Sequence, residues 1–197
     1  MSTGRIRPVA LIGLRCVGKT SVGREVARLG NARFLDLDEE ILAAWQRDHP
    51  SGGPGAGQVG HVLTSLGVEG FRELELRVLW TVLEGARAER TVLATGGGCV
   101  ETPAVRALLA EKAWCVWLRE DLGRLVQRLE RDPDARPALT SLDPAAEFQQ
   151  LARERGPYFE ALARVTIDCE GQSVDAVAER TLRELPDPWP EGSTGLG

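Results

Sequence analysis

Lysine is almost absent from this 197-residue chain: of its 24 basic residues only Lys19 and Lys112 are lysines, which leaves 22 arginines. The 29 acidic residues outnumber the basic ones and give a formal net charge of −5 at pH 7. Proteins that bind nucleic acid without sequence preference carry a basic patch or stripe. The charge balance therefore argues against nucleic acid as a partner.

Cysteine is also scarce, with four residues that form no C-x-x-C pair and have no histidine at metal-ligand spacing. We expect free thiols, as in a cytoplasmic protein. Long apolar runs are missing as well, since no segment approaches the roughly 18 residues of a membrane span. The N-terminus lacks the apolar core of a signal peptide. These absences argue against a membrane as a partner and against a disulfide or metal framework.

The chain does contain short apolar runs separated by longer helix-compatible segments. Its length suits one domain with a substantial core. An apolar run that ends in glycine, as at 7–13, predicts a buried parallel strand, and strands that alternate with helices indicate an α/β domain with a covered parallel sheet. The predicted strands are 7–13, 32–37, 91–95, 113–118 and 164–167, and the predicted helices include 19–29, 69–90 and 143–162.

Three segments interrupt this pattern. Residues 46–60 contain five glycines and two prolines, which predicts a surface loop. Residues 129–143 carry Pro133 and Pro137 between two predicted helices, which predicts a mobile connection. Residues 186–197 contain three prolines and three glycines, and we expect this tail to be disordered.

The segment from Gly13 to Thr20 matches the phosphate-loop motif G-x-x-x-x-G-K-[ST] in full. Its glycines let backbone N–H groups surround phosphate oxygens, and the following helix adds its positive end. Lys19 would reach the β- and γ-phosphates, and the Thr20 hydroxyl would ligate Mg²⁺. A glycine-rich turn that binds nothing is the alternative, but the flanking strand and helix favour nucleotide binding. The predicted contacts to ATP here are Cys16, Val17, Gly18, Lys19, Thr20 and Ser21.

Two carboxylates, Asp36 and Asp38, close the second predicted strand. Residues two apart in a strand point to one face, so both are expected in the crevice where a parallel sheet binds ligands. One carboxylate could hold the water shell of a metal ion, and the other could engage an acceptor hydroxyl. The alternative is a solvated acidic turn at the start of a helix.

Four further features each have a plain structural alternative. Arg72 and Glu75 share a helix face and could form a surface ion pair. Glycines 96–98 follow a strand and would let backbone approach a ligand closely, or form an ordinary loop. Arg136 lies in an Arg-Pro-Ala-Leu segment that could fold over the phosphates. Arg155 precedes a Gly-Pro-Tyr segment, where proline is expected to interrupt the helix.

In their order, these motifs resemble those of shikimate kinases from about Val9 to Leu185. The shared elements are the phosphate loop, Phe-x-Asp-x-Asp, Phe-Arg-x-x-Glu, a strand that ends in Gly-Gly-Gly, an Arg-Pro-x-Leu lid and an arginine before a Pro-Tyr-like segment. Very many enzymes have the phosphate loop, whereas the other five in sequence are specific to this family. The chain departs from the pattern in the long 46–60 segment, in Ala138 of the lid, and in Cys16, where Gly or Ala is usual.

The resemblance implies a P-loop kinase fold of the nucleoside monophosphate kinase type, with three α/β/α layers and five parallel strands in one domain over 1–185. A lid over about 123–142 and a helical substrate-binding region over about 38–75 would flank the sheet. The implied reaction is ATP-dependent phosphorylation of the 3-hydroxyl of shikimate, with Mg²⁺, on the route to chorismate and the aromatic amino acids. We expect a cytoplasmic monomer.

The resemblance also implies roles for the acidic residues. Asp36, together with Thr20, would lie on the Mg²⁺ side of the site. Asp38 would hydrogen-bond the shikimate hydroxyls and act as the base. With Asp38, the lysine of the phosphate loop, Lys19, would take part in catalysis through its contact with the phosphates.

The arginines would bind anions. Arg72 and Arg155 would grip the substrate carboxylate, a task that suits the bidentate guanidinium group. Arg136 would arrive with the lid and neutralise charge on the transferred group. The remaining implied contacts are those of Gly96, Gly97 and Gly98 to the substrate and of Arg128 to the adenine.

Other functions stay open at this point. A GTPase would carry an Asn-Lys-x-Asp segment, which this chain lacks. A gluconate-type or nucleoside monophosphate kinase is a second enzyme hypothesis, although Arg72 and Arg155 suit a carboxylate acceptor better than a nucleotide. A sensor that binds ATP or a metabolite without turnover is the alternative from another class, and the full set of charged motif residues argues against it.

Overall fold

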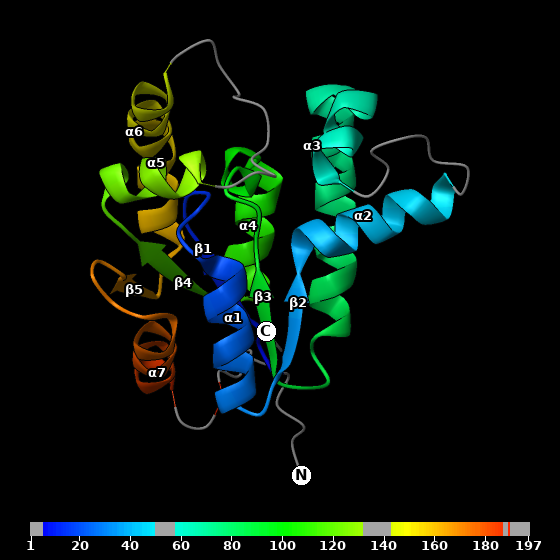
Figure 1. Ribbon diagram of the computed structural model, residues 1–197. Coiled ribbons are helices and arrows are strands. Elements are labelled where there is room, and N and C mark those ends of the chain that lie inside the picture. Colours follow the sequence, from blue (N-terminus) through cyan, green and yellow to red (C-terminus); the bar gives the residue numbers. More distant parts are fainter. Residues whose placement is uncertain (1–5, 50–57, 132–142, 187–188, 190–197) are drawn as a thin grey trace.

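A computed structural model describes residues 6–49, 58–131, 143–186 and 189, and it contains a parallel sheet between two layers of helices (Figure 1). The five strands have the order β2-β3-β1-β4-β5, and every neighbouring pair is parallel. This confirms the predicted three-layer α/β/α fold with five parallel strands. The strands are β1 (Val9–Ile12), β2 (Arg33–Asp36), β3 (Thr91–Ala94), β4 (Trp114–Arg119) and β5 (Val165–Asp168).

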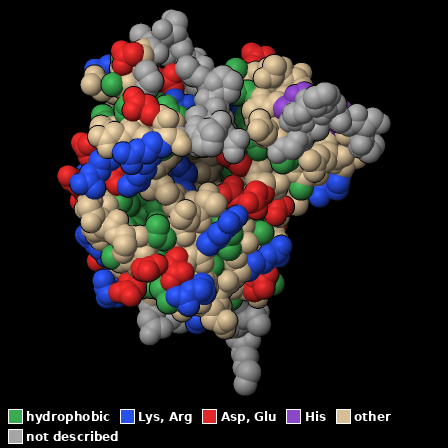
Figure 2. Space-filling view, in the orientation of Figure 1, with side chains coloured by type: hydrophobic (Ala, Val, Ile, Leu, Met, Phe, Trp, Pro, Cys, Tyr) green, Lys and Arg blue, Asp and Glu red, His purple; other side chains and the backbone are tan. Residues whose placement is uncertain are grey.

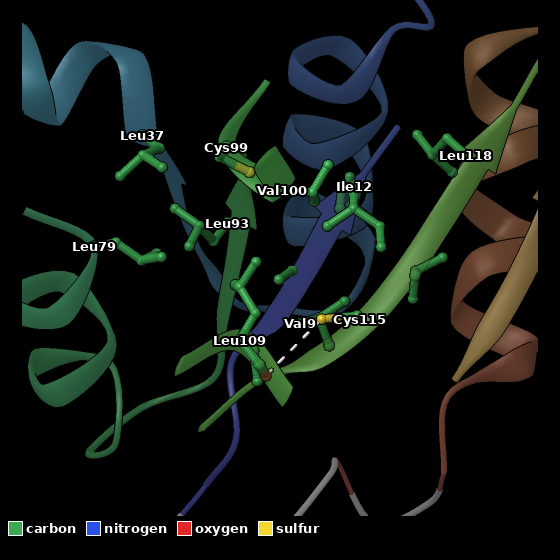
Figure 3. Packing of buried hydrophobic residues seen from close by; sticks show 14 of the residues in the cluster. Val9, Ile12, Leu37, Leu79, Leu93, Cys99, Val100, Leu109, Cys115 and Leu118 are labelled. Atoms are coloured by element: carbon green, nitrogen blue, oxygen red, sulfur yellow. Dashed lines mark hydrogen bonds between the residues drawn. The ribbon is translucent and has the colours of Figure 1, made fainter. Parts of the chain in front are cut away.

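The strands β1 and β3, inside the sheet, are fully buried. Every residue of β1 is 0% exposed, and β3 is buried along its whole length, whereas the edge strands β2 and β5 are only partly covered. A parallel sheet with helices on both faces needs apolar side chains on both sides of its inner strands, and this makes such strands visible as continuous apolar runs. Figure 3 shows Val9, Ile12 and Leu93 in this buried cluster.

The helices cover the sheet as the strand order requires. The chain moves from β1 to β2 in one direction and from β3 to β4 in the other, so right-handed crossovers place the connecting helices on opposite faces. The first and last helices pack together on one face, and α3, α4 and α6 adjoin one another on the other (Figure 1). The helices are α1 (Lys19–Leu29), α2 (Leu37–Asp48), α3 (Val59–Gly85), η1 (Cys99–Glu101, a 3-10 turn), α4 (Pro103–Lys112), α5 (Leu122–Glu130), α6 (Pro144–Leu162) and α7 (Val174–Glu184). Across the described ranges, no helix combines the length and the apolar character that a membrane crossing needs.

Helices α2 and α3 take up more of the chain than predicted. The predicted 46–60 loop is wrong at both ends, because α2 continues to Asp48 and α3 begins at Val59; residues 50–57 lie outside the described part. Within α3, Gly67 has φ 69° and ψ 176°, which is not helical. The predicted helix 69–90 corresponds to the part of α3 after this kink, and it ends too late, because α3 ends at Gly85.

Helix α6 continues through Pro157, where the sequence predicted an interruption. Phe159 and Leu162 follow the proline and are 1% and 7% exposed. Burial of two such side chains contributes about 3–6 kcal/mol, which offsets the roughly 3 kcal/mol that an interior proline costs. Tertiary packing therefore overrides the local signal.

Two segments predicted to be flexible are described only in part. In the 129–143 connection, Leu129 and Glu130 belong to α5, and residues 132–142 lie outside the described part. In the 186–197 tail, Trp189 differs from the expected disorder. Its ring is buried, and its Nε1 donates a hydrogen bond of 3.1 Å to the carbonyl oxygen of Arg7. The apolar area of one tryptophan holds that residue against the core.

Candidate active site

The loop between β1 and α1 has the backbone of a phosphate-binding loop. Gly13 (φ 144°) and Gly18 (φ 97°) adopt left-handed conformations, and Gly18 precedes the first turn of α1. A Cβ at Gly13 would lie 2.5 Å from the carbonyl oxygen of Leu118, so only glycine lets the loop pass so close to β4. Cys16 also has a positive φ of 63°, a conformation that glycine adopts without strain.

The Lys19 side chain folds back across this loop. Its ammonium donates to the carbonyl oxygens of Gly13 (3.0 Å) and Leu14 (2.7 Å) and is buried. Burial lowers the pKa of Lys19 from 10.5 to about 8, although the carboxylates of Asp38 and Asp36 act in the opposite direction. A desolvated ammonium gains more from an incoming phosphate than one already in water. Lys19 is therefore poised to bind an anion.

Asp36 and Asp38 do converge, but not as the sequence analysis expected. Strand β2 ends at Asp36, and Asp38 lies in the first turn of α2, so the same-face argument for a strand is wrong. The pair is joined by a helix cap instead, in which the backbone N–H of Asp38 donates to Oδ1 of Asp36 at 3.0 Å. The extended φ and ψ of Asp36 and its short carboxylate make it a suitable N-cap residue. The acidic helix start, the alternative named above, is thus part of the site.

The second oxygen of Asp36 faces the phosphate loop. Its Oδ2 accepts a hydrogen bond of 2.7 Å from the hydroxyl of Thr20. A hydroxyl and a carboxylate are hard oxygen ligands, and Mg²⁺ in phosphoryl-transfer sites takes one or two such protein groups and completes its shell with phosphates and water. The donor set therefore fits Mg²⁺. Within the described ranges, no three His, Cys, Asp or Glu side chains gather as a metal cage.

Glycines 96–98 pack against both halves of the site. A Cβ at Gly96 would lie 3.3 Å from Oδ1 of Asp38, and one at Gly97 would lie 2.8 Å from the backbone nitrogen of Arg15. A Cβ at Gly98 would meet Nη2 of Arg72 at 2.8 Å. A side chain at Gly97 would collide with backbone, and one at Gly96 or Gly98 would crowd the charged groups of Asp38 and Arg72. The glycine backbone therefore lies directly against the phosphate loop and the arginines.

Two arginines predicted to act together do lie together. Arg72 reaches the Gly98 backbone from α3, and Arg155 reaches it from α6, where its Nη1 donates to the carbonyl oxygen of Gly97 at 3.1 Å. Nη1 of Arg72 donates to Oε2 of the buried Glu75 at 2.8 Å. Burial acts to lower the pKa of the Arg72 guanidinium, but the charges of Glu75 and Glu101 outweigh burial and raise it. Arg72 therefore stays cationic in this cluster.

Arg128 lies beside the phosphate loop, at a cavity of about 370 Å³. Its Nη1 donates to the carbonyl oxygen of Cys16 at 3.1 Å, and its Nη2 pairs with Glu120 at 2.7 Å. Figure 2 shows this face of the molecule hollowed above α1. Besides Arg128, the cavity lining includes four predicted ATP contacts from the phosphate-loop segment, Cys16, Val17, Gly18 and Ser21. It also includes residues at and just before the start of α7, which no motif indicated: Gln172, Ser173 and Val174.

A family model described as shikimate kinase matches residues 15–186 of the chain. The chain belongs to the shikimate kinase family. It is 36% identical over 184 residues to a shikimate kinase of Novosphingobium aromaticivorans, which covers 93% of this chain and 89% of the relative. It is 34% identical over 180 residues to shikimate kinase 1 of Yersinia pestis, which covers 91% of this chain and 96% of the relative.

Solved structures give the same family. The shikimate kinase from Acinetobacter baumannii in complex with shikimate superimposes with a TM-score of 0.77 at 29% identity, over 90% of this chain and 92% of that one. A gluconokinase from Sinorhizobium meliloti superimposes with a TM-score of 0.54 at 17% identity, over 91% of each chain, which shows a shared fold alone.

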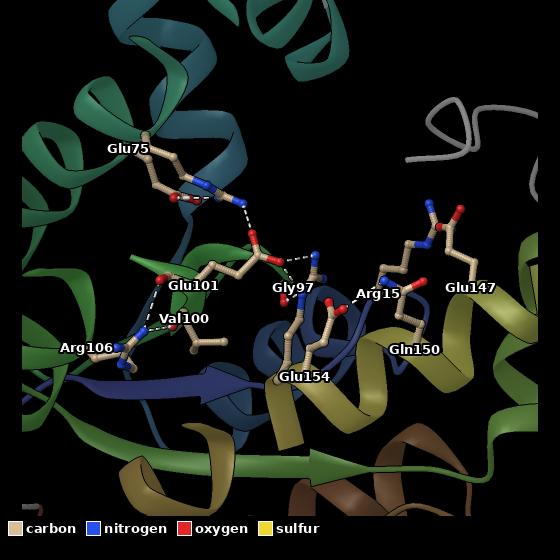
Figure 4. A network of polar contacts seen from close by, with 11 residues as sticks. Arg15, Glu75, Gly97, Val100, Glu101, Arg106, Glu147, Gln150 and Glu154 are labelled. Carbon is tan, nitrogen blue, oxygen red and sulfur yellow. Dashed lines mark hydrogen bonds and ion pairs between the residues drawn. The ribbon is translucent and has the colours of Figure 1, made fainter. Parts of the chain in front are cut away.

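Beyond the shikimate kinase motifs, the site contains charged residues that the sequence analysis missed. Glu101, in η1, pairs with both Arg72 and Arg155 (Figure 4). Arg15, inside the phosphate loop, pairs with the buried Glu147 of α6, and its guanidinium lies 5.1 Å from the centre of the Phe148 ring. The phosphate-loop motif leaves the residue type at position 15 open, so only the charge of Arg15 could have indicated its pairing with Glu147. Arg136 lies outside the described residues.

Proposed function

We propose that this chain transfers the γ-phosphoryl group of ATP to the 3-hydroxyl of shikimate. The observation that carries the proposal is the convergence of Arg72 and Arg155 on the Gly98 backbone, beside Asp38 and the phosphate loop. A small hydroxy acid needs an anion clamp for its carboxylate and a carboxylate that binds its hydroxyl groups. Membership of the shikimate kinase family and the shikimate complex of the A. baumannii relative support this acceptor.

The residues divide the reaction between them. The arginine clamp would fix the ring by its carboxylate, so that a hydroxyl group points toward the phosphate loop. Asp38 would accept the proton of that hydroxyl as the oxygen attacks the γ-phosphorus, and Lys19 would stabilise the charge on the phosphates. Positioning and charge neutralisation supply most of the catalysis in phosphoryl transfer.

Thr20 and Asp36 would hold Mg²⁺. When bound, the ion would neutralise charge on the β- and γ-phosphates. Asp36 would then have two tasks, since it also caps α2 through the N–H of Asp38. This link would position the base relative to the metal side of the site.

The nucleotide would extend from the phosphate loop toward Arg128, whose side chain adjoins the 370 Å³ cavity. We assign the adenine to this cavity. Arg136, on the lid, would complete the site by neutralising charge on the transferred group, while the lid would keep water from competing with the acceptor.

The four cysteines are free in the structure, and three of them are buried. Free thiols suit a reducing compartment. We propose that the protein acts as a monomer in the cytoplasm.

Product identification tests the acceptor. The protein is incubated with Mg·ATP and with shikimate, quinate or gluconate, and the product is examined by ³¹P and ¹H NMR. A phosphate ester on the 3-oxygen, formed from shikimate alone, supports the proposal. Phosphorylation of gluconate instead would assign another hydroxy acid, and ATP binding without any product would indicate a sensor.

A further inference from the structure

Glu101 places a carboxylate between the two guanidinium groups of the clamp (Figure 4). Its Oε1 accepts a hydrogen bond from Nε of Arg155 at 2.8 Å and forms an ion pair with Nη2 of the same side chain at 2.7 Å. Its Oε2 accepts from Nη2 of Arg72 at 2.6 Å. One carboxylate thus bridges two arginines, each of its oxygens serving a different one. A substrate carboxylate gripped by the same pair would make the same kind of contact.

The charges in this cluster balance without any ligand. Arg72 and Arg155 contribute two positive charges, and Glu75 and Glu101 contribute two negative ones. Arg155 is only 5% exposed, so an anion beside it offsets the loss of water around its guanidinium. A further carboxylate would give this cluster a net negative charge while Glu101 stays in place, so its binding would be electrostatically unfavourable.

The side chain of Glu101 can move away from the two arginines without a change in the fold. Its backbone is held by Arg106, whose Nη1 donates to the carbonyl oxygens of Val100 (2.6 Å) and Glu101 (3.0 Å), and whose guanidinium lies 4.0 Å from the centre of the Tyr158 ring. The Glu101 side chain, by contrast, is 39% exposed. A fixed backbone with a partly exposed side chain allows the carboxylate to rotate into water.

We propose that Glu101 is an internal carboxylate of the clamp that the carboxylate of the acceptor displaces when it binds. The inference rests on the proposed function, and it makes Glu101 a residue that sets affinity and selectivity for carboxylate acceptors. Because one carboxylate replaces another, Arg155 keeps an anionic partner in both states. The acceptor must replace the contacts that Glu101 makes with Arg72 and Arg155. Its affinity is therefore lower than it would be if no carboxylate occupied the two arginines beforehand.

The direction in which a substitution of Glu101 changes the affinity for shikimate distinguishes this role from a structural one. If Glu101 competes with the acceptor, Glu101→Gln removes the competing charge at nearly the same volume and tightens binding. If Glu101 instead holds the arginines in their binding geometry, the same change loosens binding. A neutral methyl ester of shikimate offers a control on the ligand side, since it has no charge to compete for the guanidinium groups.

The experiment is calorimetry of shikimate and of its methyl ester with the wild-type protein, Glu101→Gln and Glu101→Ala. Glu154→Gln is the matched control, because Glu154 is exposed one residue before Arg155 and pairs with Gln150 instead. We expect Glu101→Gln to bind shikimate up to about fivefold more tightly, the change that corresponds to loss of one partly exposed ion pair in the competing state. We expect an unchanged Kd for the ester, and we expect Glu154→Gln to match the wild type with both ligands.

Unchanged or weaker binding of shikimate by both Glu101 variants would overturn the inference, as would an equal gain for the ester. Absence of binding to every variant would overturn the inference together with the clamp. Binding is measured without ATP, so this experiment does not depend on turnover. If the protein binds shikimate without phosphorylating it, the proposed function is wrong, but the calorimetry still tests the role of Glu101. Thermal unfolding of each variant verifies that the compared proteins are folded.

Discussion

The backbone N–H of Asp38 donates a hydrogen bond of 3.0 Å to Oδ1 of Asp36, while Oδ2 of Asp36 accepts from Thr20 at 2.7 Å. One carboxylate therefore connects the phosphate loop to the first turn of α2. This arrangement leaves the Asp38 carboxylate against the Gly96 backbone, on the acceptor side. The two aspartates, so close in sequence, are thereby given different tasks.

Asp38→Asn should abolish most turnover while ATP binding stays near the wild-type value. The amide keeps the volume but cannot accept the acceptor proton, and general bases typically contribute about 10²–10⁴-fold. Steady-state kinetics and ATP titration measure the two effects. Asp48→Asn, an exposed change at the other end of α2, is the control and should have no effect. Wild-type turnover in Asp38→Asn would remove Asp38 from the proposed role.

Arg155→Ala should raise the KM for shikimate far more than the KM for ATP. The Arg155 guanidinium contacts the Gly97 carbonyl oxygen and the Glu101 carboxylate, on the acceptor side of the site. A lost charge-assisted contact of this kind is worth about 2–3 kcal/mol, or roughly 30- to 150-fold. Arg153→Ala changes an exposed arginine on the same helix and serves as the comparison. Equal effects on both KM values would argue against a carboxylate clamp.

Lys19→Met should abolish turnover and yet stabilise the unliganded protein at pH 7. Burial lowers the pKa of Lys19 from 10.5 to about 8, so at pH 7 the folded state carries a desolvated ammonium that disfavours folding by up to about 3 kcal/mol. Between pH 8 and 10.5 the folded protein has released this proton while the unfolded chain still binds it. Wild-type stability therefore rises with pH in that window relative to the variant.

Thermal unfolding of both proteins from pH 7 to 10.5 tests this sign. The advantage of Lys19→Met should be largest at pH 7 and should shrink above pH 8. A constant difference across this range would mean that the folded-state pKa of Lys19 is near its ordinary value.

Arg15→Met should destabilise the fold, because it leaves the buried Glu147 without its cationic neighbour in the phosphate loop. Removal of one partner of a buried ion pair costs about 3–5 kcal/mol. The double variant Arg15→Met/Glu147→Gln should recover part of that loss, since no buried charge is then left behind. Urea unfolding of the two single variants and the double variant gives the coupling energy. Strictly additive losses would show that the two side chains do not interact in solution.

The sequence predicted best those parts of the fold and site that follow from a local pattern, such as a buried strand or the phosphate loop. The inner strands β1 and β3 are apolar on both faces, and the helix after the phosphate loop begins at Lys19, as predicted. The motif residues Lys19, Thr20, Asp36 and Asp38 also come together, since loop and strand end at the same edge of the sheet. Local patterns suffice for features of this kind.

Other features depend on contacts that no local pattern contains. Pro157 reads as a helix break, and only the burial of Phe159 and Leu162 shows why α6 continues. Glu101 belongs to no motif, and its pairing with Arg72 and Arg155 joins residues 29 and 54 positions apart in the chain. Such pairs arise from the tertiary fold, so they become visible only when the helices are placed.

The most direct test of the proposed reaction is the initial rate of ADP release from Mg·ATP with and without shikimate. The proposal predicts release that depends on shikimate and saturates with its concentration, and little release in its absence. Release at the same rate without shikimate, or none in its presence from a protein that binds ATP, would contradict it.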